Sequence, residues 1–166
     1  GHRHDFAVAE LSVEVKASAV RRDGANHHRI THLDQLADPA SGRLLLFSLQ
    51  VVRDPNAGNS LPRLIQRVES RYAKSAVQSQ MLRQRLSQAG WSNPQAHDLA
   101  TTYRVTTEEL YLVEGAFPRL TRASFPGGPP TGVDEITYSL DLAACADWRI
   151  ATSPQEGIGH LGAMRA

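Results

Sequence analysis

The chain has 166 residues, of which 41% are hydrophobic and 21% are charged, a balance that suits one soluble globular domain and excludes a disordered segment. Its formal net charge of +1 gives no overall basic field, so any nucleic-acid binding has to come from a local patch of basic side chains. A single cysteine, Cys145, excludes an internal disulfide framework and favours the cytoplasm, and no apolar run approaches the roughly 20 residues that a membrane span needs.

The N-terminal part of the chain shows the two-residue alternation of β-strands. Residues 5–18 predict two short strands, and in the second of them Glu14 and Lys16 fall on one face, opposite an apolar face. A polar turn follows, and a further strand is expected over residues 28–31. The residues after this strand, 31–36, predict a short helical turn.

The middle of the chain combines one very apolar stretch with helical periodicity. Residues 44–52 are the most apolar and lack alternation at their start, which predicts a central strand covered on both faces. Helices are expected over 61–72, with Ser60 as the N-cap, over 76–89, and from Pro94 onward. The helix over 76–89 is expected to turn four apolar side chains inward: Val77, Met81, Leu82 and Leu86.

The last third of the chain returns to strand patterns. Strands are expected over 103–105, 110–113 and 133–142, the last with one buried face. The order of strands, then helices, then strands predicts an α/β or α+β fold with a mixed sheet. We expect a single domain over residues 1–146 and a weakly ordered tail over 147–166.

Asp5, Glu14 and Lys16 are the residues suited to phosphodiester chemistry. Cleaving a phosphodiester requires a divalent metal that binds the phosphate and lowers the pKa of the attacking water. Mg²⁺ prefers oxygen ligands and keeps several waters, so one or two carboxylates suffice to hold it. A lysine beside that metal can position the water or offset charge in the transition state. Asp5 can join Glu14 and Lys16 if the two N-terminal strands pair.

The alternative is that Glu14 and Lys16 form an ordinary solvated strand face. A Glu-x-Lys triplet occurs by chance on the order of once in a chain of this size, and such a face needs no function. Two features favour the catalytic interpretation. Asp5 precedes Glu14 by nine positions, which suits an adjacent hairpin strand, and the later strands and helix follow in the order of a known nuclease core.

Short motifs along the chain carry a resemblance to a known family. Asp5-Phe6, followed by Val13-Glu14-Val15-Lys16-Ala17, resembles the PD-(D/E)XK signature of restriction-endonuclease-like nucleases, with His4 where the motif name has proline. Further segments resemble a bacterial family of PD-(D/E)XK motif proteins that is found near restriction-modification and phage-defence genes: His28–Leu36, Leu46–Leu49, Asn59–Ile65 and Phe117–Thr121. The similarity extends over roughly residues 1–146.

The resemblance implies a fold and an activity. The fold would be an α/β restriction-endonuclease-like core with a mixed central sheet flanked by helices, plus a β-rich C-terminal extension. Asp5 and Glu14 would bind Mg²⁺ or Mn²⁺, Lys16 would be the catalytic lysine, and Gln35 would match an additional polar residue near the site. The implied activity is a metal-dependent DNA endonuclease of a restriction or phage-defence system, with DNA and other defence proteins as partners. The alternative is a non-catalytic binding or assembly module that kept the fold.

The resemblance also implies two structural expectations. The nuclease core usually opens with a helix before the aspartate, and because Gly1 lies just before Asp5, we expect that helix to be missing here. Without it, the isolated chain is expected to be inactive or unstable. Cutting both strands of a duplex commonly requires two active sites, which makes a homodimer a further expectation.

Histidines and arginines supply the candidate DNA contacts. The spacing of the histidines matches no zinc motif. Either they are polar residues at the edge of the sheet, or His28 and His32 approach the phosphate as hydrogen-bond donors. Arg63, Arg67, Arg71 and Lys74 recur at helical spacing and form one stripe along a predicted helix, which suits contacts with backbone phosphates. An amphipathic helix also needs a charged outer face without any ligand, so that alternative stays open.

Overall fold

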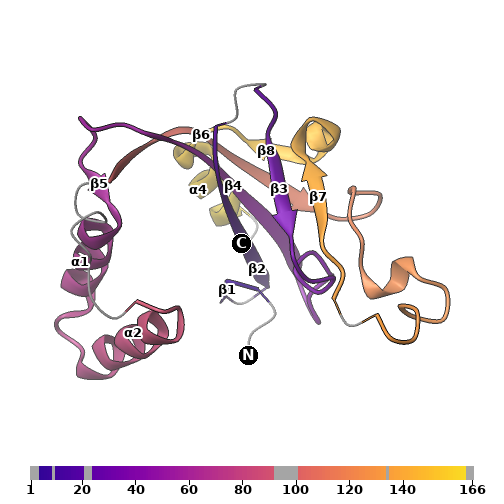
Figure 1. Ribbon diagram of the computed structural model, residues 1–166, viewed down its shortest axis with the longest axis horizontal. Coiled ribbons are helices and arrows are strands. Elements are labelled where there is room, and N and C mark those ends of the chain that lie inside the picture. Colours follow the sequence, from indigo (N-terminus) through magenta and orange to yellow (C-terminus); the bar gives the residue numbers. More distant parts are fainter. Residues whose placement is uncertain (1–3, 9, 21–23, 92–100, 134, 164–166) are drawn as a thin grey trace. The chain divides into compact units, whose positions relative to one another are not determined.

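The computed structural model describes residues 4–8, 10–20, 24–91, 101–133 and 135–163 (Figure 1). The single domain over residues 1–146 stays a prediction. Within the described residues, the contacts group the chain into two compact units. Unit 1 holds the described residues up to Val51 and from Val105 onward, and unit 2 holds Val52–Arg104. No helix in these described ranges is long and apolar enough to cross a membrane.

A mixed sheet is the framework of the fold. Its strands are β1 (Phe6–Val8), β2 (Leu11–Ala19), β4 (Arg43–Arg53), β5 (Asn59–Ser60), β6 (Thr102–Val113) and β8 (Arg149–Ala151). They lie in the order β1-β2-β4-β6-β5, and β8 pairs with β6. β1 runs antiparallel to β2, and β2 runs parallel to β4. The two strands expected over 103–105 and 110–113 are thus parts of one longer strand, β6.

β4 is the central strand that its apolar sequence predicted. Successive side chains point to opposite faces of a strand, so Leu44 and Leu46 enter one hydrophobic cluster and Leu45 enters another. All three leucines are at most 1% exposed. The prediction of a strand covered on both faces is confirmed, and β4 thereby fixes the position of β2 beside it.

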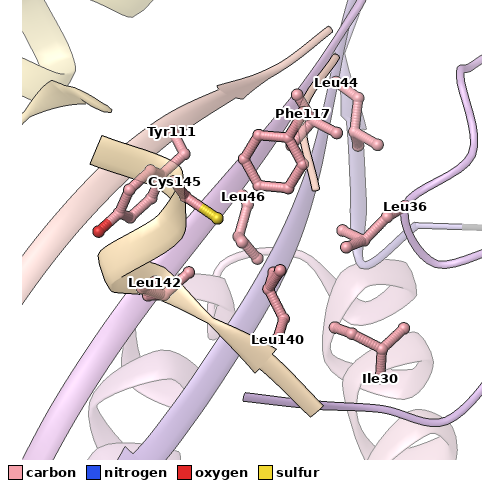
Figure 2. Packing of buried hydrophobic residues seen from close by; sticks show 10 residues of the cluster. Ile30, Leu36, Leu44, Leu46, Tyr111, Phe117, Leu140, Leu142 and Cys145 are labelled. Atoms are coloured by element: carbon pink, nitrogen blue, oxygen red, sulfur yellow. The ribbon is translucent and has the colours of Figure 1, made fainter. Parts of the chain in front are cut away.

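One face of the sheet is covered by a smaller two-stranded sheet. In it, β3 (His27–Ile30) pairs antiparallel with β7 (Tyr138–Asp141), and the 3₁₀ helix η2 (Leu142–Trp148) follows β7 directly. Figure 2 shows the side chains of these elements packed against those of β4 and β6. The cluster consists of Ile30, Leu36, Leu44, Leu46, Tyr111, Val113, Phe117, Leu140, Leu142 and Cys145.

The opposite face carries a second cluster and the C-terminal helix α4 (Pro154–Ala163). The cluster consists of Leu11, Leu45, Leu110 and Ala151. Gly157 of α4 is buried, and a β-carbon added to it would lie 3.8 Å from Leu110 Cδ2, so the helix backbone approaches β6 closely. Where the sequence suggested a weakly ordered tail over 147–166, the described residues form β8, which pairs with β6, and α4, in which Gly157 lets the helix pack closely on the sheet.

Unit 2 contains β5 and two helices, α1 (Leu61–Tyr72) and α2 (Ala76–Gln88), which confirms the helices predicted over 61–72 and 76–89. Proline in the first turn of α1 suits a helix start, since the missing N–H would have no partner there. At the start of α2, the Ser75 hydroxyl accepts a hydrogen bond from the Gln78 N–H at 3.3 Å. Each helix therefore begins at a local signal that the sequence contains.

The predicted inward orientation of apolar side chains on α2 is wrong for two of them. Val77 is 68% exposed and Met81 is 56% exposed. The two helices pack on each other, and α1 also contacts β5, but neither helix buries a residue. Periodicity indicated an apolar face without indicating what covers it. The helix expected from Pro94 onward falls outside the described residues.

Candidate active site

β2 places Glu14 and Lys16 on the sheet face that β3 and β7 cover. In the parallel register, Glu14 lies beside Leu46 and Lys16 lies beside Ser48 of β4, so these four side chains share one face. Glu14 is only 3% exposed, and Lys16 Nζ lies 2.8 Å from Glu14 Oε1. The two residues form a largely buried ion pair, which differs from the solvated strand face that the sequence left open as an alternative.

β1 brings Asp5 beside Glu14. Phe6 pairs with Val13 in the antiparallel register, which places the preceding residue, Asp5, at the level of Glu14. The Val15 N–H donates a hydrogen bond to Asp5 Oδ2 at 2.8 Å, which holds this exposed carboxylate at the strand edge. The structure therefore brings together two carboxylates and one ammonium at adjacent positions of β1 and β2.

The surroundings of Glu14 disfavour its negative charge. Burial is the largest influence and raises the pKa of Glu14 above its ordinary value, while the hydrogen bond and the charge of Lys16 act in the opposite direction. The negative charge of Asp5 raises the pKa again. A buried carboxylate with a second carboxylate beside it makes a position where an additional positive charge is stabilising. A bound cation is one source of that charge.

The donor set fits Mg²⁺ or Mn²⁺ better than zinc. Asp5 and Glu14 offer carboxylate oxygens, the ligands that Mg²⁺ prefers. Within the part of the chain that the structure describes, there is no group of three or more His, Cys, Asp or Glu side chains that could hold a metal ion. Zinc sites usually take three or four such ligands from the protein, whereas Mg²⁺ fills its remaining positions with water and phosphate oxygens.

His28 makes a buried contact that the sequence did not reveal. It lies on β3 with 2% of its surface exposed, and its Nε2 is 2.8 Å from Ser48 Oγ. Burial, and next the charge of Lys16, lower the pKa of His28 to about 4, although Glu109 acts in the opposite direction. The ring is thus neutral near pH 7 and covered, which does not suit the DNA contact predicted for it. The feature of the sequence that could have indicated this contact is Ser48, the one serine within the largely apolar stretch 44–52.

Gln35 and His32 lie on the turn that follows β3. Gln35 Oε1 accepts hydrogen bonds from the Thr31 N–H at 2.9 Å and from the Thr31 hydroxyl at 3.4 Å, so this oxygen fastens the turn. His32 is exposed and borders a cavity of about 270 Å³, together with Asp34 and Arg122. The roles at the active site and at DNA that the sequence suggested for these two residues stay predictions.

Arg63, Arg67 and Arg71 lie exposed on α1, as the predicted stripe requires. Arg63 Nη1 donates to the Gly58 carbonyl oxygen at 3.5 Å, and Arg67 Nη1 donates to Asn59 Oδ1 at 3.2 Å. These contacts restrain two guanidinium groups without burying them, so the stripe is accessible to an anion. It belongs to unit 2, whereas the two carboxylates and the lysine belong to unit 1.

Comparison with known proteins assigns the chain to a family. Residues 1–143 match the model of the family DUF4420, whose description reads "Putative PD-(D/E)XK family member". No curated protein and no solved structure gives a significant match. The matched range includes β1, β2 and β4, which carry the carboxylates, the lysine and Ser48. The mixed central sheet flanked by helices confirms the fold class expected from the sequence. The chain belongs to this PD-(D/E)XK family and has its nuclease-like fold.

Proposed function

We propose that the protein is a divalent-metal-dependent DNA endonuclease. The observation that carries this proposal is the meeting of Asp5, Glu14 and Lys16, with Glu14 buried and paired with Lys16 at 2.8 Å. A buried ion pair is often no more stabilising than well-packed apolar side chains, so stability alone does not account for this one. The pKa of Glu14 is raised by burial, and carboxylates with perturbed pKa values cluster at functional sites. Family membership supports the nuclease class.

Each of the three residues has a distinct role in the proposed reaction. Asp5 and Glu14 hold the metal through their carboxylate oxygens, and Mg²⁺ or Mn²⁺, when bound, supplies a Lewis acid and lowers the pKa of water. Lys16 donates an N–H to a phosphate oxygen, and its charge offsets the negative charge that develops as water adds to phosphorus. The bond from phosphorus to one ester oxygen then breaks, and that oxygen takes up a proton.

The test is nicking of supercoiled plasmid DNA with Mg²⁺ or Mn²⁺, and with a chelator as the metal-free control. A wild-type protein that includes the upstream helix implied by the resemblance should nick only with metal. Glu14→Gln and Lys16→Met should each lower the rate about 100-fold or more, because they remove a metal ligand and a charge beside the phosphate. Glu10→Gln changes an exposed carboxylate near the site and serves as a matched control that should nick like the wild type.

A non-catalytic binding or assembly module is the second candidate. The observation that favours it is the ion pair, because Lys16 already occupies Glu14 Oε1. Under this alternative, wild-type protein and the Glu14→Gln variant should bind duplex DNA equally, and neither should nick it. Metal-dependent nicking that disappears in Glu14→Gln would exclude the module and support the nuclease.

The proposal includes a biological setting. We place the protein in the cytoplasm, in a restriction or phage-defence system with other defence proteins, and acting as a homodimer on DNA. Two copies supply one active site for each strand of the duplex. Light scattering of the protein with a short duplex in the presence of Ca²⁺ gives the stoichiometry. Two chains per duplex are expected, and one chain per duplex would argue against the dimer.

A further inference from the structure

His28 and Ser48 form a buried polar pair on the same sheet face as Lys16. His28 comes from β3 and is 2% exposed, and Ser48 comes from β4 and is 1% exposed. Their Nε2 and Oγ atoms lie 2.8 Å apart. Ser48 is the register partner of Lys16, so their backbones are neighbours across two strands about 5 Å apart. The proposed reaction uses neither His28 nor Ser48.

The strand register places Lys16 beside Ser48, and the charge of Lys16 also acts on His28. After burial, the charge of Lys16 is the largest influence that lowers the pKa of His28. Lys16 thus has Glu14 beside it along its own strand, at 2.8 Å, and Ser48 as its register neighbour across the sheet, and His28 is hydrogen-bonded to that serine. A neutral imidazole is a suitable neighbour for an ammonium, because a charged ring would repel it.

A catalytic lysine needs neighbours that restrain its side chain more than most residues do. Its ammonium is carried on a flexible four-carbon stem, so an unrestrained lysine samples many rotamers. Catalytic groups are held in productive geometry by neighbours whose own rotamers are locked by packing and hydrogen bonds. The hydrogen bond between His28 and Ser48 locks both residues in this way, and burial prevents water from replacing it.

We propose that His28 and Ser48 are positioning residues that hold the Lys16 ammonium toward Glu14 and the scissile phosphate. The catalytic part of this inference rests on the proposed nuclease function, whereas the effect on Lys16 rests on the geometry alone. Because the pair acts through Lys16 and touches no substrate, its loss should lower kcat and leave KM unchanged.

Three variants separate positioning from packing. His28→Leu removes the hydrogen bond and keeps most of the side-chain volume, and Ser48→Ala removes the hydroxyl. His28→Gln introduces an amide that can hydrogen-bond to Ser48 in place of the imidazole. In plasmid nicking, kcat should fall about 10-fold or more in His28→Leu and Ser48→Ala, and should return to within about threefold of wild type in His28→Gln. Each variant is assayed well below its own melting temperature, so that a loss of stability is not read as a loss of catalysis.

Lysine labelling provides a readout that does not depend on nicking. The chain contains two lysines, Lys16 and Lys74, and Lys74 is exposed. Treatment with an amine-acylating reagent, followed by peptide mass spectrometry, measures the labelling rate of Lys16 relative to Lys74. This ratio should rise severalfold in His28→Leu and Ser48→Ala and return to the wild-type value in His28→Gln, because only a released ammonium becomes accessible.

The two readouts distinguish the failure of each proposal. Unchanged labelling of Lys16 in folded His28→Leu and Ser48→Ala protein would overturn the positioning role, whatever happens to kcat. If a wild-type protein that includes the upstream helix implied by the resemblance nicks no DNA with any divalent metal, the nuclease proposal fails. The labelling ratio then still decides whether the pair positions Lys16.

Discussion

Glu14 shows how one residue links the stability of the fold to the chemistry of the site. Its carboxylate is buried, and the ammonium of Lys16 lies 2.8 Å away. Removing only the lysine leaves a buried charge without a partner, which typically costs about 3–5 kcal/mol if the charge persists. Because the folded-state pKa of Glu14 is raised, part of that cost can be avoided by protonation. Glutamine at position 14 keeps the volume and removes the charge, so it is the preferred substitution in activity tests.

Burial of His28 predicts a pH dependence of stability. Its pKa is about 4 in the folded protein against 6.5 ordinarily, so the unfolded chain binds more protons between these values. The stabilising effect of the neutral ring is fully present above about pH 6.5 and is lost as the pH falls toward 4. Between about pH 7.5 and pH 5 the free energy of unfolding should therefore fall by about 2 kcal/mol from this residue, as measured by urea denaturation.

The control for this prediction is His28→Gln, which has no titratable group at position 28. The difference in unfolding free energy between wild type and variant isolates the histidine from all other titrations. That difference should change by about 2 kcal/mol over the same pH range. Parallel pH profiles for the two proteins would contradict the buried, neutral state of His28.

At the scale of elements, the pairing of β2 with β4 decides which side chains meet. Parallel neighbours need a crossover between them, and here the crossover includes β3, which returns over the sheet face and brings His28 to Ser48. A slip of one residue in this register would turn Glu14 and Lys16 to the opposite face. Gly42, directly before β4, lies where the crossover enters the sheet.

Gly42 is predicted to be intolerant of a side chain. Its φ of +78° is strained for other residues, and a β-carbon there would overlap the carbonyl group of Glu10. The Arg43 N–H donates to that same carbonyl oxygen at 2.8 Å, which prevents the two segments from moving apart freely. Gly42→Ala should therefore lower the free energy of unfolding by more than about 2 kcal/mol, measured by thermal or urea denaturation.

Gly115→Ala is the matched control for this substitution. Gly115 also has a positive φ, +55°, but a β-carbon there would meet nothing within 4 Å. Only the backbone strain should then reduce stability, by about 1 kcal/mol. Similar reductions in Gly42→Ala and Gly115→Ala would show that Gly42 does not approach Glu10 so closely.

At the scale of the whole molecule, the charges that suit DNA and those that suit a metal belong to different units. The net charge of +1 provides no general attraction to DNA, and the proposed metal site is acidic. Affinity for phosphates would then come from local basic groups. The exposed arginine stripe on α1 is such a group, and it lies in unit 2.

The arginine stripe predicts a salt-dependent contribution to DNA binding. Replacing Arg63, Arg67 and Arg71 together by glutamine should weaken binding to duplex DNA of any sequence. The slope of the logarithm of the binding constant against the logarithm of the salt concentration should become shallower by up to about 3, because each arginine would neutralise roughly one phosphate. Arg83→Gln/Arg85→Gln on α2 is the matched control and should leave the slope unchanged. An unchanged slope in the triple variant, measured by fluorescence anisotropy, would favour the alternative of an ordinary solvated helix face.

Local patterns in the sequence determined a substantial part of this protein. Strand periodicity is a property of neighbouring residues, so alternation over 11–18 was sufficient to place Glu14 and Lys16 on one face. The unbroken apolar run at 44–52 identified the central strand for the same reason. Helix-start signals at Ser60 and Ser75 are local as well, and both helices follow them.

Only the tertiary structure decided what covers each face. Which strands pair, and in what register, depends on residues far apart in the chain, and no local period encodes it. The burial of Glu14, the contact between His28 and Ser48, and the packing of α4 on the sheet all follow from that pairing. The pattern of Glu14 and Lys16 thus became a candidate site through its neighbours, because a carboxylate is perturbed by what surrounds it and not by its position in a sequence.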